Sequence, residues 1–103
     1  MKKGDFIAVW LHDSAAREFL GLNKAKKPSR WVMLAQIEDP EGAVGPWLSI
    51  EYIEERRPSH GASKEKRIRY TVTPKICLIR YDFIVTAQLM GEKVTEIGFH
   101  QES

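Results

Sequence analysis

The side chains best suited to chemistry in this chain are basic ones, and they gather in two stretches. Ten of the sixteen lysines and arginines lie in residues 23–30 and 56–69, where Glu65 is the single carboxylate. The other positions hold thirteen acidic and six basic residues, so a formal net charge of only +2 conceals a polarised chain. Clustered cations attract phosphate. We expect an anion-binding surface made by Lys24, Lys26, Lys27, Arg30, Arg56, Arg57, Lys64, Lys66, Arg67 and Arg69.

Two aromatic residues adjoin these stretches, which makes nucleic acid a candidate partner. Single-stranded nucleic acid is bound by cations that hold phosphates and by rings on which bases stack. Trp31 follows the first stretch and Tyr70 follows the second, so both are candidate stacking residues. The predicted partner is RNA or single-stranded DNA, or an acidic protein, with little sequence specificity. A tryptophan on a strand is more often part of the core, and this alternative stays open for Trp31 and is favoured for Trp47.

The sequence offers little support for metal binding or catalysis. The histidines, His12, His60 and His100, are far apart and show no metal-ligand spacing. Cys77 is the only cysteine, which excludes an internal disulfide, and its apolar context ICLI predicts a buried, slowly reacting thiol. No glycine-rich phosphate loop or nucleophile motif is present. We predict no catalytic residue, no metal and no cofactor.

Three carboxylates near the second basic stretch are the remaining candidates for acid-base chemistry. Glu51, Glu54 and Glu55 all belong to the strand predicted at 47–55. Alternation along that strand favours a simpler interpretation, in which they form its solvent-facing side and its exit.

Hydrophobic alternation predicts a mainly β protein with one short helix. The expected strands are 6–11, 31–37, 47–55, 67–73, 75–79, 83–89 and 94–99, with a polar loop at 56–66, a tight turn at 80–82 and a hairpin loop at 90–93. A helix is expected at 14–20, between Asp13 as N-cap and Gly21 as C-cap. Strand 31–37 is apolar on both faces, which predicts a central strand.

Two segments carry a resemblance to small barrels. The opening KKGDFIAVWL resembles the first strand of SH3-like barrels, and TVTPKICLIRYDFIVTA resembles the close of SH3-like and Sm-like barrels, where a one-turn helix precedes the last strand. The resemblance implies a small antiparallel barrel, here with a short helix inserted after the first strand. It implies no functional residue, because the helix position departs from the Sm pattern and the Sm glycines and RNA-contacting positions are missing. An open antiparallel sheet covered by the helix is the alternative.

If the strands form an up-and-down meander, the two basic stretches lie at the same end. The connection between the first two strands and the connection at 56–66 then share one end, and the acidic turn at 38–41 lies at the other. The basic stretches would merge into a single patch. The alternative is that both are solvated loops which keep the protein soluble.

The chain as a whole predicts one cytoplasmic domain over residues 1–103 with no membrane segment, because no apolar run approaches about 20 residues. Two further functions remain open. Strand 94–99 would support a homo-oligomer if its edge paired with another copy. A small-molecule or enzymatic site would need a pocket, for which Trp10, Trp31 and Tyr52 are the expected lining.

Overall fold

The structure is a computed structural model, which describes residues 1–58 and 66–91. Strands make up 51% of it, which confirms the mainly β prediction. The elements in chain order are β1 (Phe6–Leu11), α1 (Asp13–Leu20), β2 (Arg30–Asp39), β3 (Trp47–Arg57), β4 (Lys66–Tyr70), β5 (Ile76–Leu78), the 3-10 turn η1 (Tyr81–Phe83) and β6 (Ile84–Gly91).

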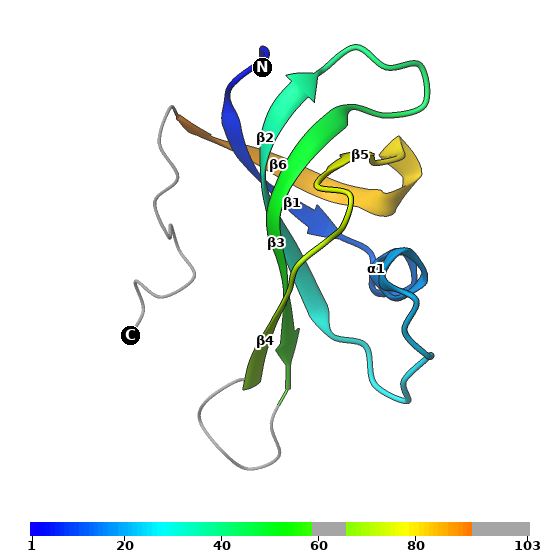
Figure 1. Cartoon of the computed structure of the whole chain (residues 1–103). Coiled ribbons are helices and arrows are strands. Elements are labelled where there is room, and N and C mark those ends of the chain that lie inside the picture. Colours follow the sequence, from blue (N-terminus) through cyan, green and yellow to red (C-terminus); the bar gives the residue numbers. More distant parts are fainter. Residues whose placement is uncertain (59–65, 92–103) are drawn as a thin grey trace.

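These strands form one antiparallel sheet that does not close. Its order is β4-β3-β2-β1-β6, and β5 pairs with the first part of β3 (Figure 1). The first four strands are therefore a meander, which is the arrangement that places the two basic stretches at one end. Among the described residues β4 and β6 end the sheet and do not pair with each other, so the predicted closed barrel is not confirmed.

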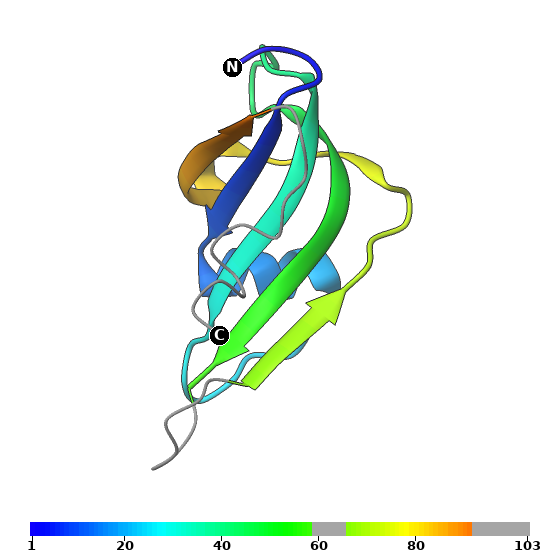
Figure 2. The same ribbon diagram turned by 90° about the vertical axis from the view of Figure 1, so that its left-hand side faces the viewer.

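The central position of β2 follows from its composition. Five consecutive residues from Trp31 to Ala35 are buried, because β1 and β3 flank the strand and both of its faces are covered. The main core includes Val9, Trp31, Met33 and Ile53 on one face of the sheet. Helix α1 and the β5–η1 segment lie on that side (Figure 1). The opposite, outward face is turned to the viewer in Figure 2.

Helix α1 confirms the predicted helix and its C-cap but corrects its N-cap. Ala15 and Ala16 are buried against the sheet, and Gly21 ends the helix with a left-handed φ of 72°. The N-cap is His12, and Asp13 is the first helical residue. The Asp13 side chain makes tertiary contacts instead, which are described below.

The strand boundaries correct both ends of the loop predicted at 56–66, whose residues 59–65 lie outside the described residues. Strand β3 runs through Arg57, and β4 begins at Lys66 and ends at Tyr70, three residues earlier than expected. The strand continues through charged residues because each arginine pairs with a glutamate two positions earlier. Strand β6 includes Gly91, and the predicted strand 94–99 lies outside the described residues.

The β2–β3 connection packs closely on the segment around η1. Ile79 donates a backbone hydrogen bond to Pro46 at 3.0 Å, and Tyr81 donates one to Val44 at 2.8 Å. Gly45 lies between these contacts, where a β-carbon would collide with the backbone carbonyl of Ile79. Because backbone cannot yield as a side-chain tip can, this position requires glycine.

Replacing Gly45 by alanine should lower the free energy of unfolding by about 2–3 kcal/mol through overpacking. The control is Gly21→Ala. A β-carbon at Gly21 would meet no neighbouring atom, so only the positive φ of this residue disfavours alanine, and the expected cost is about 1 kcal/mol. Urea denaturation of both variants, followed by tryptophan fluorescence, measures the difference. Equal losses would contradict the packing assigned to Gly45.

Candidate functional site

A fully buried carboxylate lies at the end of the sheet where the two basic stretches meet. The exposed fraction of Glu55 is 0%, and it accepts four hydrogen bonds. Its Oε2 atom accepts from Ser29 Oγ at 2.7 Å, Arg57 Nε at 2.9 Å and Arg17 Nη2 at 3.2 Å. Its Oε1 atom accepts from Tyr70 Oη at 2.9 Å. Glu55 thus joins α1, the α1–β2 connection, β3 and β4.

These donors keep the buried carboxylate ionised. Burial alone would raise the pKa of Glu55, but hydrogen bonds from Arg57, Ser29 and Tyr70 outweigh it, and the pKa lies below its ordinary value of 4.5. The pKa of Tyr70 is raised by burial and by its bond to Glu55. The pKa of Arg57 is raised because its guanidinium donates to Glu55.

Asp13 is a second acceptor in the same network. Its Oδ1 atom accepts from Trp31 Nε1 at 2.7 Å, the Ser29 backbone N–H at 3.0 Å and Arg17 Nε at 3.1 Å. Burial opposes ionisation of this carboxyl, but the bonds from Trp31, Ser29 and Arg17 hold its pKa below the ordinary value of 3.8. Asp13 and Glu55 therefore fix Ser29 and the buried Arg17 from both sides.

A separate pair of ionic contacts lies on the outward face. Buried Glu54 accepts from Arg56 Nε at 3.1 Å and from Arg69 Nε at 3.2 Å. The Arg56 guanidinium lies 5.4 Å from the ring centroid of Trp10, and that of Arg69 lies 4.2 Å from the ring centroid of Tyr52. Aromatic and arginine side chains thus share this face of the sheet.

The burial of these carboxylates corrects the prediction that Glu54 and Glu55 face solvent. The sequence does carry a signal for it: in the run EERR each glutamate faces the same side of a strand as the arginine two residues later. Glu51 is half-buried and pairs with Lys75 at 2.9 Å, so it is closer to the solvent-facing position predicted for all three glutamates. Trp47, expected in the core, is 43% exposed because Leu48 takes the inward position.

The sheet register brings the two basic stretches together. Arg30, the first residue of β2, is the cross-strand partner of Arg56, and Arg56 is the partner of Arg67. Arg57 is paired with Lys66 in the next row. We call this end of the sheet, with the α1–β2 connection, the basic pole. The acidic β2–β3 connection lies at the opposite end (Figure 1).

The predicted anion-binding residues differ in how they are presented. Arg56 is buried and paired with Glu54, so its side chain stabilises the fold and is not presented at the surface. Lys64 lies outside the described residues. The others are exposed at the basic pole: Lys24, Lys26, Lys27, Arg30, Arg57, Lys66, Arg67 and Arg69.

Burial changes the choice of aromatic residue for base stacking. Trp31 is 0% exposed, with Arg17 and Tyr70 against its ring, so it is a core residue and the stacking role predicted for it is withdrawn. Tyr70 is half-buried and its hydroxyl is bound to Glu55. Sequence reasoning did not assign a nucleic-acid role to Trp10, which is half-buried on the outward face. Trp10 and Arg30 help to line an open cavity of about 490 Å³.

A smaller cavity of about 330 Å³ lies within the basic pole itself. It joins the helix, the first basic stretch and the end of β3. Its lining residues are Arg17, Ala25, Lys27, Ser29, Arg57 and Pro58. Cations from both basic stretches therefore face one space.

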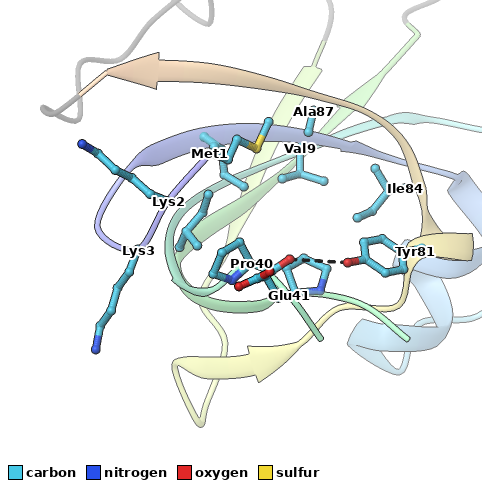
Figure 3. Close-up of a pocket in the computed structure, with 12 residues that line it drawn as sticks. Met1, Lys2, Lys3, Val9, Pro40, Glu41, Tyr81, Ile84 and Ala87 are labelled. Atoms are coloured by element: carbon cyan, nitrogen blue, oxygen red, sulfur yellow. Dashed lines mark hydrogen bonds between the residues drawn. The ribbon is translucent and has the colours of Figure 1, made fainter. Parts of the chain in front are cut away.

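A larger apolar cleft of about 830 Å³ opens at the opposite end, beside the N-terminus and β6 (Figure 3). Val9, Ile84 and Ala87 line it, while the side chains of Lys2 and Lys3 point away from it (Figure 3). It contains none of the three residues expected for a ligand pocket. Trp10 and Trp31 instead line the 490 Å³ cavity, without Tyr52.

Other potential chemistry is sparse in the described residues. Cys77 is half-buried rather than buried, its Sγ contacts the Pro74 carbonyl at 3.0 Å, and burial raises the pKa of the thiol. Across residues 1–58 and 66–91, no three histidine, cysteine or acidic side chains are placed to hold a metal ion. The same residues contain no helix long and apolar enough to cross a membrane.

Comparison with known proteins adds no family to this description. No protein-family model matches the chain, and no curated protein or solved structure matches it significantly.

Replacing Glu55 by glutamine should lower the free energy of unfolding by about 3 kcal/mol, because Arg17 and Arg57 would lose their buried counter-charge. The matched control is Glu51→Gln, which removes a more exposed ion pair and should cost less than about 1 kcal/mol. Chemical denaturation at neutral pH compares the two. A loss for Glu55→Gln no larger than for the control would contradict the role given to Glu55.

Stability should also decline in acid. Because Glu55 and Asp13 have lowered pKa values in the folded protein, they stabilise it above their unfolded pKa values, and this is lost as pH falls through the folded ones. The free energy of unfolding should be nearly constant above about pH 5 and fall below about pH 4. Urea titrations across this range test it. The free energy of unfolding of the Asp13→Asn variant should fall less steeply as the pH is lowered. An unchanged slope in this variant would contradict the lowered pKa assigned to Asp13.

Proposed function

We propose that this protein is a non-enzymatic binding module whose basic pole binds the phosphates of single-stranded RNA or DNA. The observation that carries the proposal is the cross-strand row in which the exposed Arg30 and Arg67 flank the buried Arg56, with the exposed Arg57 and Lys66 beside it. The two basic stretches are far apart in sequence, yet their cations occupy one end of one sheet. Their fields add there, which favours a polyanion over a single small anion.

The distribution of acids supports the same proposal. Among the described residues, Asp13, Glu54 and Glu55 lie beside the pole and are engaged in internal hydrogen bonds with arginine. Of the described exposed acids, Asp39 and Glu41 belong to the opposite end, Glu18 lies on α1 and Asp82 lies on η1. Eight of the predicted cations remain exposed at the pole, so its solvent-facing charge is strongly positive.

Trp10 supports nucleic acid over an acidic protein as the partner. Its ring is half-buried on the outward face and lines the same cavity as Arg30. A base stacked at this position would have its phosphates near the arginine row. Phosphate contacts and stacking discriminate poorly among bases, so little sequence preference is expected.

We also propose that the fold is an open relative of SH3-like small barrels. The strand order β6-β1-β2-β3-β4 and the one-turn helix η1 before the last described strand support this. The proposal concerns architecture alone, and no binding residue is taken from it.

A second candidate function is assembly with another copy of the chain. Val85 and Leu89 are exposed on β6, which among the described residues pairs only with β1. Light scattering during size-exclusion chromatography measures the mass. A stable oligomer that does not bind nucleic acid would favour assembly.

The binding proposal predicts a strong salt dependence for a single-stranded RNA oligonucleotide. Replacing Lys24, Lys26 and Lys27 together by glutamine should weaken binding to all sequences similarly. The slope of log affinity against log salt should flatten by about 2 if all three lysines contact phosphates. These lysines are exposed in a connection, so the fold should persist. Fluorescence anisotropy at several salt concentrations provides the measurement.

The matched control replaces Lys2, Lys3 and Lys75, which are exposed outside the basic pole, and removes the same charge. It should change affinity and slope much less. Equal effects of the two triple variants would show a nonspecific response to net charge. Absence of binding at low salt would overturn the proposal, and binding to polyglutamate without binding to RNA would favour an acidic protein partner.

A further inference from the structure

The 330 Å³ cavity in the basic pole has the features of a site for a single phosphate group. Its volume is at the small end of the range of about 300–1,000 Å³ for ligand pockets. Its charged lining comes from separate elements: Arg17 from α1, Lys27 from the α1–β2 connection and Arg57 from β3. A phosphate that entered would meet Lys27 and Arg57 from two separate elements, while Arg17, which is paired with Asp13 and Glu55, forms the inner wall.

Arg57 is oriented by the buried network. Its Nε atom donates to Glu55 at 2.9 Å, while its side chain remains 45% exposed and lines the cavity. A guanidinium has five N–H donors in a planar fork, so the bond through Nε leaves further donors for a ligand. The fork geometry suits two oxygens of one phosphate.

The inner wall of the cavity is fixed before any ligand arrives. Arg17 is held by Asp13 at 3.1 Å and by Glu55 at 3.2 Å, and Ser29 is held by the same two carboxylates. Lys27 is exposed at the rim and supplies a mobile point charge. Prearranged donors lose less entropy on binding than free side chains do.

We propose that this cavity holds one phosphate of the bound strand, with Arg57 as the bidentate donor and Lys27 as the second cation. The inference rests on the proposed function and specifies where in the basic pole a phosphate sits. A phosphodiester within a strand and a terminal phosphate share this chemistry. Glu55 supports the site indirectly, because it fixes the orientation of Arg57.

The test is a titration followed by NMR of the backbone amides and of the Arg57 Nε–H group. Inorganic phosphate should produce saturable shifts at Arg57, Ser29 and Lys27. The dinucleotide UpU probes the internal phosphodiester, and 5′-UMP probes the terminal phosphate. Tighter binding of UpU would assign the site to the strand interior, and tighter binding of 5′-UMP would assign it to a strand end.

Arg57→Gln should weaken phosphate binding about tenfold, because it removes a charge-assisted bidentate contact. Arg80→Gln is its control, since Arg80 is an exposed arginine paired with Asp82 outside the pole. Lys27→Gln should also weaken phosphate binding, with Lys75→Gln as its control. Because Lys27 is exposed, its replacement should leave the fold intact, so this variant tests the site even if Arg57→Gln does not fold. Unsaturable shifts, or equal affinity in pole and control variants, would overturn the inference.

The two proposals fail in different ways. If RNA binds with the predicted salt dependence but phosphate gives no saturable shifts, the basic pole binds strands without this pocket. If phosphate binds here and RNA does not, the cavity is an anion site and the proposed function is wrong. If neither RNA nor phosphate binds, both proposals for the basic pole are wrong.

Discussion

The buried charge of Glu55 is the constraint on which this end of the molecule depends. An ionised carboxylate without solvent is stable only when several donors surround it. Its donors are Arg17, Ser29, Arg57 and Tyr70, which come from four different parts of the chain. A single side chain therefore sets the relative positions of the helix, the α1–β2 connection and two strands.

This constraint also explains how the surface acquires its polarity. Among the described residues, the buried acids Glu54 and Glu55 of the basic pole are directed inward, Glu55 to Arg17 and Arg57 on one face and Glu54 to Arg56 on the other. The cations that remain at the surface then dominate its potential. The same ion pairs that stabilise the fold thus remove the negative charge that would repel a polyanion, which links stability and the proposed binding.

The sequence predicted the parts of this arrangement that follow from local patterns. The helix ended by Gly21, the central strand beginning near Trp31 and the shared end of the basic stretches all follow from alternation and chain reversal. Alternation shows which residues share a face, but not what covers it. The run EERR shows that Glu55 shares a face with Arg57, but the burial of that face and the exposure of Trp47 depend on neighbours brought by the tertiary fold. The small cavity depends on the same network.

The most direct test of this account is the ionisation of Glu55 itself. NMR of the carboxyl carbon of Glu55, followed as a function of pH, measures its pKa in the folded protein. We predict a midpoint below the ordinary value of 4.5, because the donated hydrogen bonds outweigh burial. A midpoint above 4.5 would contradict it, since the carboxyl would then be held by burial as a neutral group and would not join the two basic stretches as an ion.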